Sequence, residues 1–307
     1  MARKTVVFGG AGFLGSHVAD ALSERRHAVT VFDRGSSPWL RPDQKMLVGD
    51  VLDEAKVAAA VRGAEVVYNF AGVADIAEAS RRPLESVRSN ILGNTVILEA
   101  CRRAKVKRFV FASTLYVYGK AGSFYRSTKQ ACELLIENYH EIYGLPYTIL
   151  RYGSLYGPRS NDTNYIRQIL RQAIKERRIA REGDGEEIRE YIHVLDAARD
   201  SVDILAPEFS NQHVIITGHQ AMKIKDLLLM LREILDGGVA IEYVKPRFDY
   251  HYEITPYTFA PRIARRLGSR SYLDLGQGLL NYIQEIYQEL HLRPTQDGLP
   301  RPARPRR

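Results

Sequence analysis

The sequence predicts an α/β fold in which a doubly wound parallel sheet carries helices on both faces and a smaller α/β cap follows toward the C-terminus. Short β-branched runs alternate with amphipathic stretches through the N-terminal half, which implies successive βαβ units. Several of these runs are almost wholly apolar, as strands with helices on both faces require. A glycine-rich turn at residues 9–15 follows the first run, where such a sheet receives its ligand.

The elements follow in order along the chain. Strands are predicted at residues 4–8, 28–32, 46–48, 65–70, 107–112 and 146–151, with helices at 13–25, 54–61, 84–104 and 126–143. The regular alternation of strands and helices ends after residue 158. From there the patterns predict a strand within 187–194 and helices at 164–178, 195–205, 223–235 and 276–290. We therefore expect one domain over residues 1–158, with some later segments returning to it, and a cap mainly over 159–290.

Composition excludes several classes of protein. A chain of 307 residues with 45% hydrophobic and 26% charged residues is typical of a globular protein. No apolar run approaches the roughly 18 residues of a membrane helix, and no signal-peptide pattern follows Arg3 and Lys4. We expect a cytoplasmic protein with no membrane partner. Cys101 and Cys132 lie in helical patterns without metal-ligand spacing, which predicts reduced thiols and no metal site.

The net charge of +8 is concentrated at one end of the chain. About half of it comes from the last fifteen residues, where five arginines stand against Asp297 in a Pro-rich segment without periodicity. We expect residues 291–307 to form a disordered basic tail. The rest of the excess makes no dense stripe, so the sequence predicts no nucleic-acid partner.

The glycine-rich turn predicts a dinucleotide site. Gly9, Gly12 and Gly15 follow the first strand and open the first helix, whose N–H groups and positive dipole end would face a pyrophosphate. Asp33 ends the second strand, where its carboxylate can accept hydrogen bonds from an adenosine ribose and would repel a 2′-phosphate. NAD is therefore the expected cofactor, and Arg34 leaves NADP open as the alternative. The chain lacks the Gly-Lys-Ser/Thr sequence of a P-loop.

Two Tyr-x-x-x-Lys patterns occur, and their context separates them. Tyr116 and Lys120 fall at a strand end and turn, where a four-residue spacing does not bring side chains together. Tyr125 and Lys129 fall in a helical pattern, where residues i and i+4 share a face. A free tyrosine has a pKa near 10, so a base at neutral pH needs nearby positive charge, which Lys129 and a nicotinamide ring would supply. Tyr125 is the predicted base, and Lys129 its partner and a ribose ligand.

Ser113 and Thr114 end the strand that precedes this helix. Ligands of doubly wound sheets bind at the carboxyl ends of the strands, so a hydroxyl here can hydrogen-bond a reacting oxygen. A single hydroxyl at such a place would more simply be a helix cap or a turn contact. Together with Tyr125 and Lys129, it predicts a catalytic set.

These residues, in this order, resemble the extended short-chain dehydrogenase/reductase superfamily, specifically its NAD-dependent nucleotide-sugar epimerase/dehydratase branch, of which UDP-glucose 4-epimerase is an example. The resemblance covers about residues 4–290. It is carried by GGAGFLG (9–15), Asp33, Gly49-Asp50-Val51, NFAG (69–72), Asn90-x-x-Gly93, STLYVYG (113–119), YRSTK (125–129), RYGSLYGP (151–158) and GDGEEIREYIHVLDAA (183–198).

The resemblance implies a Rossmann-type NAD-binding domain, a substrate-binding cap, and particular contacts. Asp50 and Val51 would flank the adenine, while Phe70 and Ala71 would pass along the cofactor. The further implied cofactor contacts are Phe13, Leu14, Asn90, Tyr125, Lys129 and Tyr152. Thr114 matches the family's catalytic Ser/Thr. The expected substrate contacts are Thr114, Ser154, Arg189, Tyr191 and Arg247. Helices at about 84–104 and 126–143 match those that form the family's homodimer.

Departures from the family pattern narrow the chemistry. Members that eliminate water carry an Asp-Glu pair directly after the catalytic Thr, where this chain has Leu115 and Tyr116, and decarboxylating members carry a Glu nearby. Both reactions are therefore disfavoured. Ser154 replaces an Asn that binds phosphate, and Asn69 replaces a His. Only residues 120–124 separate Gly119 from Tyr125, where relatives carry about twenty.

The leading hypothesis is an NAD-dependent epimerase that acts at C4 of an NDP-hexose through a 4-keto intermediate. The first alternative is an NAD(P)-dependent NDP-sugar ketoreductase or dehydrogenase with net redox turnover. The second is a catalytically silent NAD-binding protein that binds a partner or RNA. A complete set of Thr114, Tyr125 and Lys129 favours an enzyme, because a binding module has no need of it.

Overall fold

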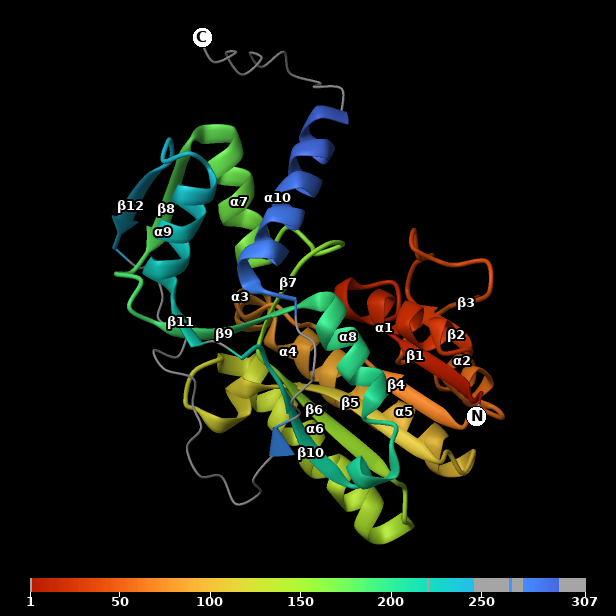
Figure 1. The fold of residues 1–307 in the computed structure, drawn as a ribbon. Coiled ribbons are helices and arrows are strands. Elements are labelled where there is room, and N and C mark those ends of the chain that lie inside the picture. Colours follow the sequence, from red (N-terminus) through yellow and green to blue (C-terminus); the bar gives the residue numbers. More distant parts are fainter. Residues whose placement is uncertain (1, 220, 246–264, 267–272, 293–307) are drawn as a thin grey trace.

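The computed structural model describes residues 2–219, 221–245, 265–266 and 273–292. Its main sheet has the strand order β13-β10-β6-β5-β4-β1-β2-β3 (Figure 1), and every pairing within it is parallel. The strands are β1 (Lys4–Phe8), β2 (Ala28–Asp33), β3 (Lys45–Val48), β4 (Val66–Asn69), β5 (Arg108–Thr114), β6 (Tyr147–Tyr152), β10 (Gln212–Ile216) and β13 (Arg265–Arg266). The predicted doubly wound parallel sheet is confirmed.

The strand order reverses beside β1. After β2 and β3 have been laid on one side of β1, the chain crosses back and places β4 on the other side. Phe8, the last residue of β1, is paired with Phe32 of β2 and Asn69 of β4. The turn that follows Phe8 therefore lies at the switch point, the place where open α/β sheets bind ligands.

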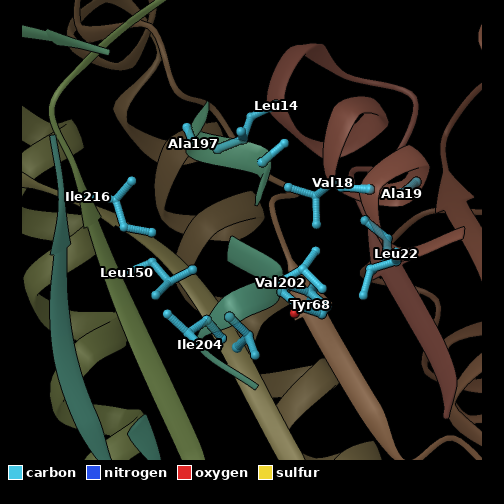
Figure 2. Close-up of a cluster of buried hydrophobic side chains, with 14 of the residues drawn as sticks. Leu14, Val18, Ala19, Leu22, Tyr68, Leu150, Ala197, Val202, Ile204 and Ile216 are labelled. Carbon is cyan, nitrogen blue, oxygen red and sulfur yellow. The ribbon is translucent and has the colours of Figure 1, made fainter. Parts of the chain in front are cut away.

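One face of the sheet is covered by α1 (Phe13–Glu24) and α8 (Val194–Asp203). Figure 2 shows the packing, with Leu14, Val18 and Leu22 of α1 facing Ala197 and Val202 of α8 above the strands. Alternation along each strand decides which side chains join them. The strand side chains on this face include Val7, Val31, Tyr68, Val110, Leu150 and Ile216.

The opposite face is covered by α2 (Glu54–Val61), α5 (Gly93–Arg103) and α6 (Ser123–Tyr143). The alternate residues of each strand point to this second face, where Val6, Phe109 and Ile149 pack on these helices. Both faces are thus buried, which explains why the strands read as nearly continuous apolar runs.

Some helices differ from the sequence expectation. The single helix expected at 84–104 is built as α4 (Pro83–Ser86), a π-helical segment (Val87–Leu92) and α5. α3 (Ile76–Arg81) was not predicted, and the segment after β5 is a 3₁₀ turn, η2 (Leu115–Tyr118), rather than a strand end. α6 begins at Ser123, three residues earlier than expected, because Gly122 takes a positive φ of 98° that starts the helix abruptly.

The C-terminal part of the chain builds a second core. A three-stranded sheet contains β7 (Ser154–Tyr156), β9 (Ile188–His193) and β11 (Ala221–Lys223), and a two-stranded sheet contains β8 (Arg178–Glu182) and β12 (Ala240–Val244). The helices α7 (Tyr165–Glu176), α9 (Ile224–Ile234) and α10 (Leu275–Leu292) lie beside these sheets (Figure 1). Their apolar side chains form one shared cluster. Short η3 (Pro207–Phe209) leads into β10.

The boundary at residue 158 stays a prediction. Segments that follow it return to the main sheet, since β10 pairs with β6 and α8 packs on α1. Most of the expected tail, residues 293–307, lies outside the described residues, whereas residues 291 and 292 still belong to α10.

Three findings concern classes of site. No helix in the described ranges is both long and apolar enough to cross a membrane. The same ranges hold no group of three or more His, Cys, Asp or Glu side chains suited to a metal ion. Cys101 and Cys132 are buried and form no disulfide.

Candidate active site at the carboxyl edge of the sheet

The glycine turn between β1 and α1 leaves no room for side chains. Gly9 has a φ of 73°, and a Cβ added there would lie 2.6 Å from the Ala71 nitrogen. A Cβ on Gly15 would overlap the carbonyl oxygen of Gly9. The Gly12 N–H donates to that same oxygen at 3.1 Å, which closes the turn. Glycine at positions 9 and 15 is therefore required by the close approach of the turn, the helix and the end of β4.

The start of α1 is an uncompensated positive helix end. Its N-cap, Gly12, has no side chain to accept a hydrogen bond, and the first turn holds no acidic residue. The N–H groups of Phe13 and Leu14 belong to the first turn of the helix, where no partner exists within the helix itself. An anionic group such as a pyrophosphate is the natural partner for these donors.

Asp33 lies beside this turn. Its Oδ2 accepts the Ala11 N–H at 3.0 Å and its Oδ1 accepts the Arg34 N–H at 2.7 Å. Each carboxylate oxygen keeps a second acceptor site, so Asp33 can hold the turn and still accept from a ribose hydroxyl. The Gly49 N–H donates to the Asp33 carbonyl at 2.9 Å, which places Asp50 and Val51 at the same edge.

The loop after β4 forms the other wall of the edge. The Phe70 ring stacks on Tyr68, with centroids 6.0 Å apart, and the Phe70 N–H donates to the Phe8 carbonyl at 2.8 Å. Asn69 accepts the Ala71 N–H at 3.0 Å and donates to Asn94 at 2.9 Å. The asparagine that replaces the family's histidine thus holds the backbone of this loop.

Asn90 clamps the same loop from the π-helical segment. Its Oδ1 accepts the Val73 N–H at 2.7 Å, while its Nδ2 donates to the Val73 carbonyl and to Thr128 Oγ1. All the polar atoms of this buried side chain are therefore engaged by protein groups. A direct contact with the cofactor stays a prediction for Asn90, and its contacts here are those of a residue that positions the loop.

Thr114 and Tyr125 meet at the end of β5. The Tyr125 hydroxyl is hydrogen-bonded to the Thr114 side chain, whose Oγ1 also accepts the Tyr116 N–H at 3.3 Å. The ring of Tyr116 meets Tyr125 edge to face, with centroids 6.4 Å apart. The structure therefore brings together two members of the predicted catalytic set, with Tyr116 beside them.

Lys129 completes the set but contacts the backbone. It is 7% exposed, and its Nζ donates to the Ala112 carbonyl at 2.6 Å while lying 5.8 Å from the centroid of the Tyr125 ring. Burial lowers the pKa of Lys129 to about 8, partly opposed by the neighbouring Cys132 and Glu133. The ammonium is therefore close to losing its proton at the upper end of the physiological pH range.

The lowering of the Tyr125 pKa by Lys129 and a nicotinamide ring stays a prediction. Burial raises the pKa of Tyr125 to about 12, and the hydrogen bond with Thr114 opposes this only in part. The physical reason is that removing a phenolate from water costs more than one neutral hydroxyl returns. Further positive charge at this edge is needed before Tyr125 can act as a base near neutral pH.

Ser113 is separated from Thr114 by the alternation of the strand. Its hydroxyl donates to Glu133 of α6 within the buried interior, with Ser113 3% exposed. The two hydroxyls considered together in the sequence thus have different partners, and Thr114 is the one that contacts Tyr125.

The remaining predicted contacts lie in different parts of the fold. Tyr152 is a core residue whose hydroxyl bonds Ser201 of α8 at 2.6 Å, so any cofactor contact would have to come from its backbone. Ser154 of β7 is the register partner of Tyr191 on β9, two residues after Arg189. Arg247 lies outside the described residues.

Two residues that the sequence did not single out fix the short segment before Tyr125. Arg126 donates to the carbonyls of Gly119 and Lys120, and Gln130 donates to the Val117 carbonyl at 2.9 Å. Both follow Tyr125 on α6 and stand four residues apart, so one helix face holds η2 and the loop together. That spacing was the available signal.

The chain is similar to proteins of related chemistry. A UDP-N-acetyl-alpha-D-glucosaminuronate decarboxylase of Bacillus cytotoxicus is 27% identical over 80% of this chain and 84% of its own length. A putative UDP-glucose 4-epimerase of Methanocaldococcus jannaschii is 29% identical over 89% of this chain and 95% of its own. The two relatives are almost equally similar to this chain but are named for different reactions, so sequence similarity does not identify the reaction of this chain.

A solved structure gives the same picture. UDP-glucose 4-epimerase of Thermotoga maritima, with UDP-glucose, matches with a TM-score of 0.81 and 25% identity, covering 94% of this chain and 99% of that one. The model of the NAD dependent epimerase/dehydratase family matches residues 5–216, a range that holds the glycine turn, Thr114, Tyr125 and Lys129. The chain belongs to the NAD dependent epimerase/dehydratase family.

Proposed function

We propose that the chain is a nucleotide-sugar epimerase that acts at C4 of an NDP-hexose through a 4-keto sugar, with Tyr125 as the base. The observation that carries the proposal is the hydrogen bond between Tyr125 and Thr114, with Lys129 one helical turn further along. All three side chains lie at the carboxyl edge of the sheet, close to the turn that can receive a dinucleotide.

The turn fits NAD. The close approaches at Gly9 and Gly15 and the open positive end of α1 suit a pyrophosphate, and Asp33 suits an unphosphorylated ribose. Bound NAD would supply a hydride acceptor and a positive charge at the carboxyl edge. The residues that would hold it are those of the turn with Asp33, Asp50, Val51, Phe70, Ala71 and Lys129.

The chain's own groups would then handle the proton. Tyr125 would remove the proton from the sugar O4, and Thr114 would hydrogen-bond the same oxygen. After the keto-sugar has rotated in the site to present its other face, Tyr125 would return the proton to O4 of the other epimer. Its pKa of about 12 in the protein alone implies that the phenolate forms only when positive charge has been added beside it.

Residues 115 and 116 support epimerisation over two other reactions of the family. Leu115 is buried against Ile215, and Tyr116 places a phenol ring edge against Tyr125. Neither offers the carboxylic acid that the resemblance associates with loss of water from the sugar. The proposal therefore assigns this site hydride and proton transfer at C4 without elimination.

The cap would hold the nucleotide. Arg189 on β9 and Tyr191 two residues later extend from the strand that pairs with Ser154 on β7. An arginine has a permanently charged, planar head that suits a diphosphate. Arg189, Tyr191 and Ser154 are our candidates for the diphosphate-sugar end of the substrate.

The test is turnover without net redox. Purified protein should carry NAD that is released on denaturation, and incubation with UDP-, dTDP-, GDP- and CDP-hexoses should give a C4 epimer by NMR for at least one of them. Absorbance at 340 nm should stay constant during turnover. A stoichiometric change at 340 nm would instead identify a ketoreductase or dehydrogenase, and NAD binding without turnover of any sugar would favour a silent binding protein.

We also propose a homodimer through α4, the π-helical segment, α5 and α6. Several large apolar side chains are exposed on these segments. They include Leu84, Val87, Leu92, Leu134 and Ile142. Exposed apolar side chains gathered on neighbouring helices are a common feature of protein interfaces.

A Leu134→Glu variant is expected to convert the dimer to a monomer. Leu134 is 62% exposed on α6, so a charge there costs little in the monomer and would be desolvated in the interface. Light scattering after size exclusion measures the mass. Leu229→Glu, on α9 of the cap and 39% exposed, is the matched control and should remain dimeric. Identical masses for the wild type and Leu134→Glu would contradict this interface.

A further inference from the structure

A buried polar cluster lies behind the catalytic set. Glu133 of α6, 6% exposed, accepts from Arg151 Nε at 3.1 Å and from Arg151 Nη2 at 2.6 Å. The same carboxylate accepts the hydroxyl of Ser113, the residue directly before Thr114. Arg151 Nη1 also donates to the Tyr118 hydroxyl at 2.7 Å in η2. One carboxylate therefore joins β5, β6, η2 and α6.

Glu133 also stands one helical turn after Lys129. A spacing of four places the two side chains on one face of α6, and both are buried. Lys129 donates to the Ala112 carbonyl and Glu133 accepts from Ser113, so they contact consecutive residues of β5. Burial lowers the pKa of Lys129, and the negative charge of Glu133 is among the groups that oppose this.

We propose that Glu133 is a positioning residue of the active site, which keeps Lys129 charged and fixes the Ser113–Thr114 end of β5 against α6. The catalytic role of Lys129 rests on the proposed function, whereas the effect of Glu133 on Lys129 does not. A charged Lys129 beside Tyr125 requires a nearby negative charge, because desolvation alone favours the neutral amine.

The surroundings single out Glu133 among the buried carboxylates of α6. Glu137 lies one turn further from Lys129, where its Oε1 is 3.1 Å from His213 Nε2. The titratable groups beside Lys129 are Tyr125, Cys132 and Glu133. Those beside Glu133 are Arg151 and His213, which in turn contact Tyr118 and Glu137. The thiol of Cys132 has a pKa raised to about 12 by burial, so it carries no charge near neutral pH. Glu133 is thus the anion nearest to Lys129 along the helix.

A purely structural role for the Glu133–Arg151 pair makes a different prediction. A buried ion pair that only anchors α6 would cost stability when one partner is removed, because the other charge is left unpaired. It would leave the titration of Lys129 unchanged. The two roles are therefore separated by the protonation of Lys129 rather than by stability.

The experiment titrates Lys129 directly by NMR in protein labelled with ¹³C at lysine Cε, with the resonance assigned by its loss in Lys129→Arg. In Glu133→Gln the midpoint should move to lower pH by about half a unit or more from the wild-type value. Glu137→Gln, the matched loss of a buried carboxylate one turn away, should leave it in place. An unchanged midpoint in Glu133→Gln would overturn the proposal.

A double variant removes the risk of misfolding. In Glu133→Gln/Arg151→Met neither charge remains unpaired, so the fold should tolerate the change. The Lys129 midpoint should fall by less than in Glu133→Gln, because the repulsion from Arg151 is lost as well. A midpoint that moves in neither variant refutes the role of Glu133. With a sugar that the protein converts, kcat can also be measured against pH, and its alkaline limb should move to lower pH by the same amount. If the midpoint shifts in Glu133→Gln but the wild type converts no sugar, the proposed function is refuted and the role of Glu133 is not.

Discussion

A Tyr125→Phe variant is expected to lose about 10²- to 10⁴-fold in kcat, the usual contribution of a positioned general base. The change removes only the hydroxyl that is hydrogen-bonded to Thr114, while the ring that meets Tyr116 remains. Because Tyr125 is partly buried at the start of α6 and donates no hydrogen bond on which the helix depends, the fold and the bound NAD should be kept.

The matched control is Tyr116→Phe. Tyr116 begins the other Tyr-x-x-x-Lys pattern, lies beside Tyr125, and is not assigned a proton to transfer. We expect it to keep kcat within about tenfold of the wild type, since only a neighbouring hydroxyl is removed. Steady-state rates and the amount of NAD released on denaturation should be measured for both variants. Full activity of Tyr125→Phe would mean that the base has been misassigned.

A Gly9→Ala variant is expected to fold poorly and to lose its NAD. The residue has a φ of 73°, and the added Cβ would lie 2.6 Å from backbone atoms of residues 70 and 71 that cannot move freely. The left-handed conformation costs about 1–2 kcal/mol for alanine, and the overlap adds about 1–3 kcal/mol. Together these are a large part of the stability of an ordinary protein.

Gly63→Ala separates strain from overlap. Gly63 has a φ of 72°, nearly that of Gly9, but an added Cβ there would meet no atom within 4 Å. Its variant should therefore lose only the conformational part, about 1–2 kcal/mol, and should keep NAD. Chemical denaturation and released nucleotide measure both effects. Equal losses in the two variants would show that the crowding at the turn is unimportant.

Much of the fold follows from local sequence. The alternation between Val6 and Val7 assigns one to each face of the sheet, and the same alternation recurs at Phe109 and Val110. The glycine turn could be predicted because no side chain fits where α1, β1 and the loop after β4 meet, so the sequence must have glycine there. Such features depend on a few neighbouring residues, which is why sequence patterns identify them.

Other elements depend on distant partners. β8 and β12 are short runs with interspersed charges, in which Ile179 alone is buried. They become strands by pairing with each other across more than fifty residues. β10 likewise joins the main sheet by pairing with β6, about sixty residues earlier in the chain, and with β13. Nothing in the local pattern of these segments specifies the partner, so they were not predicted.

The candidate site shows the same division. The helical spacing of Tyr125 and Lys129 was readable, but the preference of the Lys129 ammonium for the Ala112 carbonyl was not. The separation of Ser113 from Thr114 follows from strand alternation, yet only the structure identifies Glu133 as the partner of Ser113. Tyr152 belongs to a motif of the family, but its hydroxyl is bound in the core by Ser201, a residue about fifty positions away that the motif does not reveal.

The central claim is that hydride leaves C4 of the sugar and returns to C4 of its epimer within one active site. The most direct measurement uses an NDP-hexose that carries deuterium at C4, incubated with the protein and an excess of unlabelled NADH. The account predicts a C4 epimer that retains deuterium at C4, with none in the free nicotinamide pool. Deuterium found in the free NADH, or a product that has been reduced or oxidised overall, would contradict it.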